Sequence, residues 1–155
     1  MLSILTGLPA DEKNDKLFVE RFMSVDAIKV ICGSSTMKMF CRIQNIIPEI
    51  KIIFEKNIPV AKYKIENINL ATEGIITLNS CYKYLINNKI KTIDDAVNLA
   101  GFFNKCQTIN FFVGTAQNID SNNYKNFGLL TRIEIVNKIV DFLKQKNKTI
   151  NIFEE

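Results

Sequence analysis

Short apolar runs alternate with longer amphipathic segments along almost the entire chain of 155 residues. The apolar runs are not broken at every second position by polar residues, which is typical of strands covered on both faces. The longer segments carry apolar residues at helical spacing. This alternation predicts an α/β fold of three layers, a Rossmann-like open and mostly parallel sheet with helices on both faces. No repeat or linker-like stretch interrupts it, so we expect a single domain over residues 1–155.

The same patterns predict where each element lies. We expect strands at residues 2–5, 27–32, 50–54, 59–65, 68–71, 108–113 and 148–153. We expect helices at residues 11–23, 37–44, 75–86, 92–105 and 127–146, with Thr92 as an N-cap. The run 59–65 alternates polar and apolar residues, which indicates a less buried or edge strand, and an edge strand could pair across a homodimer. The apolar stripe of the last helix is expected to be Leu129, Ile133, Val136, Val140 and Leu143.

Composition excludes several kinds of chemistry. The chain contains no histidine, which excludes Ser-His-Asp hydrolysis, Cys-His acyl transfer and histidine-ligated zinc. Its cysteines are scattered, with no Cys-x-x-Cys pair, so neither a zinc knuckle nor a thioredoxin-type dithiol is encoded. Since hydrophobic residues make up 47% of the chain and charged residues 23%, we expect a folded, reduced, cytoplasmic protein without a cofactor.

Charge and hydropathy also limit the partners. The net charge of +4 comes from lysines spread along the chain, and the only arginines are Arg21, Arg42 and Arg132. Nucleic-acid-binding proteins usually cluster their positive charge and use bidentate arginines, so we do not expect a nucleic-acid partner. No apolar stretch approaches the roughly 20 residues of a membrane span, and residues 1–5 are too short an apolar run for a signal peptide.

Polar residues gather directly after four of the predicted strands. Right-handed crossovers bring such strand-to-helix loops to the carboxyl edge of a parallel sheet, where open α/β folds bind ligands. Glycine allows close approach of the backbone, hydroxyl groups donate hydrogen bonds, and a helix N-terminus attracts anions. The residues expected at this edge are Thr6, Gly7, Gly33, Ser34, Ser35, Thr36, Thr72, Glu73, Gly74, Gly114, Thr115 and Asn118, with Arg132 from the helix that follows.

Each of these residues has a structural and a functional interpretation. Residues 33–36, Gly-Ser-Ser-Thr, either form an N-capping turn or bind an anion, but they match neither a Walker A loop nor Gly-x-Gly-x-x-Gly. Glu73 either caps a helix or accepts hydrogen bonds from ribose hydroxyls. Arg132 either lies on a solvated helix face or contacts a phosphate. The only other carboxylate close to these loops is Asp11, so we predict no metal site.

Four segments resemble, in order, the C-terminal accessory domain of SpoIIE-type bacterial serine phosphatases. Residues 71–78, Ala-Thr-Glu-Gly-Ile-Ile-Thr-Leu, are similar to its Val-Thr-Glu-Gly-Ile-Leu-Thr-Leu segment, and residues 30–36 to its strand-Cys-Gly-Gly-Thr-Thr turn. Residues 5–9 resemble its opening Leu-Thr-Gly-Pro-Pro, and residues 112–118 its Val-Gly-Arg-Ala-x-Asn turn. Ser34 replaces a glycine of this pattern and Thr115 an arginine. Nothing resembles the phosphatase's metal motifs, so the resemblance implies an accessory or sensory α/β domain.

Two functional hypotheses follow. The first is a non-catalytic domain that binds a small anionic ligand, a nucleotide or sugar phosphate, and either senses it for a signalling partner protein or sequesters it. Here residues 33–36 hold the phosphate, Glu73 accepts from hydroxyls, and Thr115 and Asn118 form the far wall. The alternative is a small transferase-like or isomerase-like enzyme for a phosphorylated or acyl substrate, with Glu73 as catalytic carboxylate.

Overall fold

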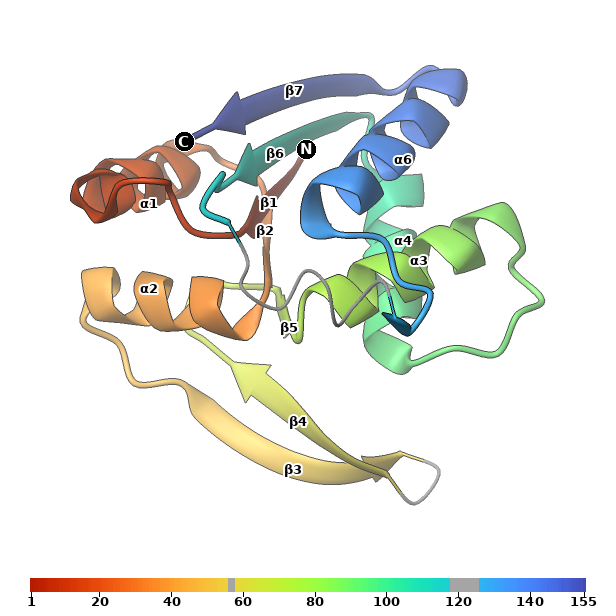
Figure 1. Ribbon diagram of the computed structural model, residues 1–155, viewed down its shortest axis with the longest axis horizontal. Coiled ribbons are helices and arrows are strands. Elements are labelled where there is room, and N and C mark those ends of the chain that lie inside the picture. The colour runs from red at the N-terminus through yellow and green to blue at the C-terminus, as the bar shows by residue number, and fades with distance from the viewer. Residues whose placement is uncertain (56–57, 118–125) are drawn as a thin grey trace.

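The computed structural model describes residues 1–55, 58–117 and 126–155 and confirms the open, mostly parallel α/β sheet (Figure 1). Its strands are β1 (Leu2–Thr6), β2 (Ile28–Cys32), β3 (Glu49–Glu55), β4 (Ile58–Lys64), β5 (Leu70–Thr72), β6 (Thr108–Val113) and β7 (Thr149–Glu154). Their order across the sheet is β3-β4-β5-β2-β1-β6-β7. Strands β5, β2, β1, β6 and β7 run parallel, whereas the pairs β3–β4 and β4–β5 are antiparallel.

Helices cover both faces of this sheet. They are α1 (Asp15–Ser24), which follows the short 3-10 helix η1 (Glu12–Asn14), α2 (Ser34–Gln44), α3 (Ile75–Ile86), α4 (Asp94–Lys105) and α6 (Arg132–Gln145). One face packs against α1 and α2 and the other against α3, α4 and α6 (Figure 1). In the part of the chain that the structure describes, no helix is long and apolar enough to cross a membrane.

The central strands are buried because each supplies apolar side chains to two cores. All five residues of β1 are buried, and in both β2 and β6 only the first residue is not. On one face Leu5 and Phe112 pack in a cluster with Phe18 and Phe22 of α1, and the Phe22 and Phe112 ring centroids lie 5.6 Å apart. Because both faces of these strands are packed against side chains, the position of each strand end is fixed. The position at which the following loop begins is fixed with it.

The strand predicted at residues 59–65 is β4, and the expectation that it lies at an edge is wrong. It pairs with β3 on one side and with β5 on the other. The described sheet ends instead at β3 and β7. Its alternating sequence fits an antiparallel strand, since such strands can leave one face to solvent. The pairing with β3 runs the length of β4, whereas the pairing with β5 is confined to Tyr63 and Ala71.

The predicted starts of the last two helices are also wrong. The last helix begins at Arg132, not at residue 127, because Thr131 donates both its backbone N–H and its hydroxyl to the Glu134 carboxylate, 2.9 and 2.7 Å away. Leu129 therefore lies outside α6 and Ile133 is exposed. The buried face of α6 is Ile135, Val136, Ile139, Val140 and Leu143. In α4 the N-cap position belongs to Ile93, so Thr92 is not the cap.

We predict opposite effects of alanine at two glycines. A Cβ atom at Gly114 would lie 2.2 Å from the carbonyl carbon and oxygen of Leu8, a backbone contact that cannot relax cheaply. Gly114→Ala should lower the free energy of unfolding by at least about 2 kcal/mol in denaturant titrations. At Gly101, within α4, no atom lies within 4 Å of the added carbon, so Gly101→Ala should stabilise the protein by about 0.5–1 kcal/mol. Equal stability of the two variants would contradict the prediction.

Candidate functional site

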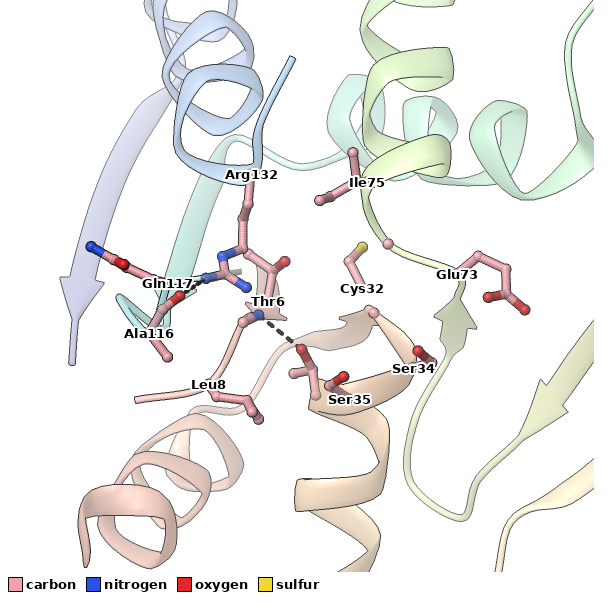
Figure 2. Close-up of a pocket in the computed structure, with 14 residues that line it drawn as sticks. Thr6, Leu8, Cys32, Ser34, Ser35, Glu73, Ile75, Ala116, Gln117 and Arg132 are labelled. Atoms are coloured by element: carbon pink, nitrogen blue, oxygen red, sulfur yellow. Dashed lines mark hydrogen bonds between the residues drawn. The ribbon is translucent and has the colours of Figure 1, made fainter. Parts of the chain in front are cut away.

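A cavity of about 170 Å³ lies over the carboxyl ends of the central strands (Figure 2). From β1 the chain passes through α1 to β2 on one side, whereas β6, on the other side of β1, leads through α6 to β7. A parallel sheet opens a crevice where its connections diverge in this way. The residues that line this cavity are Thr6, Gly7, Leu8, Cys32, Gly33, Ser34, Ser35, Thr36, Glu73, Gly74, Ile75, Ala116, Gln117 and Arg132.

Two helix N-termini meet at this cavity because two glycine backbones touch. Gly33 precedes α2 and Gly74 precedes α3, and neither position supplies a side-chain cap. A Cβ atom at Gly74 would lie 2.7 Å from the Cα of Gly33, and the φ angle of Gly74 is +90°. Only glycine combines this conformation with so close an approach. The first turns of α2 and α3 therefore present their N–H groups and the positive ends of their dipoles at the cavity.

Helix α2 begins three residues earlier than the predicted residue 37, so Ser34, Ser35 and Thr36 form its first turn. The Thr36 hydroxyl is buried and accepts a 2.8 Å hydrogen bond from the backbone N–H of Gly7 (Figure 2). This bond ties the β1 loop to the start of α2. Ser35 is exposed and Ser34 partly so, which leaves both at the surface of the cavity.

Arg132, the first residue of α6, extends its guanidinium group over the loop that follows β1 (Figure 2). A Cβ atom at Gly7 would lie 2.5 Å from the guanidinium carbon, so the glycine provides the space that the arginine fills. Nη2 donates a 2.6 Å hydrogen bond to the carbonyl oxygen of Ala116. Among the described residues no carboxylate pairs with this arginine, and its buried Nε has no hydrogen-bond partner. Burial lowers the pKa of Arg132 from its ordinary value, since the charged form loses hydration.

Glu73 borders the cavity on the side opposite Arg132. Its Oε1 accepts a 3.0 Å hydrogen bond from the hydroxyl of Tyr63 on β4. In Figure 2 its carboxylate is directed away from Arg132 and toward the outer rim, beyond Ser34. Burial, and then the hydrogen bond to Glu73, raise the pKa of Tyr63, so the phenol remains a donor at neutral pH. The N-cap position of α3 belongs to Gly74 and no side-chain hydrogen bond caps it, so Glu73 is not the cap of this helix.

The structure thus brings together most of the predicted site residues, but it places three of them elsewhere. Thr72 is buried beneath the cavity, where its hydroxyl accepts a 3.3 Å hydrogen bond from the N–H of Gly74. Gly114 is buried against the backbone of Gly7 and Leu8. Thr115 turns toward the end of the chain and donates its hydroxyl to the carbonyl oxygen of Glu155, 2.7 Å away. These three do not line the cavity, and Asn118 lies outside the described residues.

Sequence reasoning missed several residues that do line it: Leu8, Cys32, Ile75, Ala116 and Gln117. Each adjoins a predicted residue, so the strand ends themselves were the available signal. Cys32 is 1% exposed, and burial raises the pKa of its thiol to about 12. The thiol is therefore protonated at neutral pH, which argues against a nucleophilic role.

Comparisons with protein-family models, with curated proteins and with solved structures found no match for this chain. Among the described residues no group of three or more Cys, Asp or Glu side chains is close enough to hold a metal ion.

We predict that the Thr36 hydroxyl holds the β1 loop in place. Thr36→Val removes the hydroxyl that accepts from the buried Gly7 N–H and should cost about 1–3 kcal/mol of unfolding free energy. Thr36→Ser keeps the hydroxyl and serves as the control. The two variants should differ most in amide hydrogen exchange at Gly7, which Thr36→Val accelerates and Thr36→Ser preserves. Equal protection of Gly7 in both would contradict this role.

Proposed function

We propose that this protein is a non-catalytic domain that binds a small anionic ligand, a nucleotide or sugar phosphate, over the carboxyl ends of its central strands. One observation carries the proposal: the partly buried guanidinium of Arg132 borders the cavity without a carboxylate partner among the described residues. Burying a cation whose N–H donors lack acceptors costs free energy unless an anion accepts hydrogen bonds from them. A phosphate offers the bidentate acceptor geometry that guanidinium prefers.

The helices that surround the cavity increase this preference. Arg132 occupies the first turn of α6, where the helix dipole disfavours a positive charge. The first turns of α2 and α3 add two further positive dipole ends. The carboxylate of Glu134 accepts from Thr131, and that of Glu73 accepts from Tyr63. A bound phosphate would relieve the repulsion among these groups, which supports an anion as the ligand.

Among the described residues that line the cavity, Glu73 is the one carboxylate, and its surroundings support binding without turnover. Histidine is missing from the sequence, and the thiol of Cys32 is buried and protonated. The carboxylate of Glu73 accepts from Tyr63 and lies apart from Arg132 (Figure 2). We propose that such a domain works in the cytoplasm, where it either reports the ligand to a signalling partner or sequesters it, as the resemblance to a phosphatase accessory domain implies.

Binding can be tested with a thermal-shift panel of inorganic phosphate, pyrophosphate, sugar phosphates and nucleotides. A ligand at about 100 times its Kd should stabilise the protein by about 2.7 kcal/mol. Arg132→Met should weaken that ligand about 10- to 100-fold, the value of a charge-assisted hydrogen bond of about 1.5–3 kcal/mol. Lys144→Met, at the opposite end of α6, removes the same charge and should not alter the affinity. The proposal fails if no phosphorylated compound shifts the midpoint.

The role of Glu73 is open to a separate test. If it accepts from ligand hydroxyls, Glu73→Gln should weaken a sugar phosphate about 2- to 10-fold and leave inorganic phosphate unaffected. Glu66→Gln, an exposed carboxylate after β4, is the control. Incubation of the same compounds with the wild-type protein should return them unchanged by mass spectrometry. Conversion that Glu73→Gln abolishes would favour the enzymatic alternative.

A further inference from the structure

A second cavity, of about 470 Å³, adjoins the first. The two share Leu8, Ser35 and Ala116, so they are separated only by a ridge that these residues form. In Figure 2 Leu8 lies between Ala116 on one side and Ser35 of α2 on the other. The first cavity alone is smaller than the roughly 300–1,000 Å³ that small-molecule sites usually occupy, whereas the second falls within that range.

One face of α2 forms a wall of the second cavity. Ser35, Lys38, Met39 and Arg42 follow each other at intervals of three, one and three residues, which places them on one side of the helix. The same helix therefore presents its N-terminus to the first cavity and its side to the second. A ligand that binds at the N-terminus can continue along this side without leaving the protein surface.

The chemistry of the second cavity differs from that of the first. Apolar or uncharged groups from Leu8, Pro9, Ala10, Met39 and Ala116 line much of it. Its acidic side chains are already occupied, because Arg42 pairs with Glu12 at 2.5 Å and also with Asp15. Lys38 is exposed and has no ion-pair partner in the described part of the chain. An apolar surface with one available cation at its rim favours a group with apolar faces and a polar edge.

We infer that the ligand is a nucleoside phosphate whose base occupies this second cavity and whose ribose crosses the ridge at Leu8 and Ser35. The inference rests on the proposed function, which places the phosphate near Arg132. A nucleobase has two apolar faces and a polar edge, which match the lining and Lys38. A sugar phosphate is polar on all sides, so it would leave the second cavity empty and gain nothing from burial there.

The test compares ligands that fill one or both cavities. Measured by calorimetry, at least one of the four common ribonucleoside 5′-monophosphates should bind at least tenfold more tightly than ribose 5-phosphate. Ala10 is exposed at the second cavity, so Ala10→Phe fills it without a buried substitution. This variant should abolish the tenfold gain and leave ribose 5-phosphate within twofold of wild type. Arg132→Met should instead weaken both ligands to the same extent.

Lys38 provides a second variant, with a matched control. Lys38→Gln should weaken the nucleotide at least threefold and leave ribose 5-phosphate unaffected, whereas the exposed Lys138→Gln in α6 should change neither. If ribose 5-phosphate binds as tightly as every nucleotide, the inference is overturned and the proposed function stands. If Ala10→Phe weakens both ligands equally, the inference is likewise overturned. If no phosphate compound binds, the proposed function itself fails.

Discussion

The contact between the backbones of Gly33 and Gly74 is the constraint on which the site depends. It allows the helices that follow β2 and β5 to begin side by side. The N–H of Gly33 continues the pairing of these two strands through a 2.9 Å hydrogen bond to the Thr72 carbonyl oxygen. With any larger residue at position 74, the added Cβ would meet the backbone of Gly33 and the starts of α2 and α3 would be forced apart. The convergence of two helix dipoles is thus a consequence of local backbone packing.

The remaining walls are attached to this centre by hydrogen bonds between loops. Thr36 accepts from Gly7, the Ala116 N–H donates to the Leu8 carbonyl oxygen at 3.0 Å, and Arg132 donates to Ala116. Each bond joins segments that are distant in sequence, and each leaves the N-termini of α2 and α3 uncovered. Beneath them lie β1, which is fully buried, and β6, which is buried except at its first residue, and these strands give the loops a rigid base. The arrangement is preorganised, so a ligand would not have to bear the cost of ordering it.

The sequence predicted the fold and the side of the sheet on which the candidate site lies, because apolar, unalternating strands and strand-end glycines are local signals. It did not predict which side chains turn inward. Thr115 resembles Ser35 as an exposed hydroxyl after a strand, yet it is directed to the carbonyl oxygen of Glu155, a contact between residues 40 apart. The start of α6 could have been found, since Thr131 and Glu134 have the spacing of a capping box. The second cavity could not, because it depends on the packing of α1 against α2.

The position of β1 has a consequence for how the molecule folds. This first strand lies between β2 and β6, and its register with β6 pairs Ser3 with Asn110, 107 residues later. One side of β1 stays unpaired until most of the chain has been made, and such distant pairing slows folding. During that interval an apolar strand has an exposed edge, which is a hazard for aggregation. A ligand that joins the β1 loop to Arg132 would hold together parts of the chain that meet last, and so would favour completion of the native sheet.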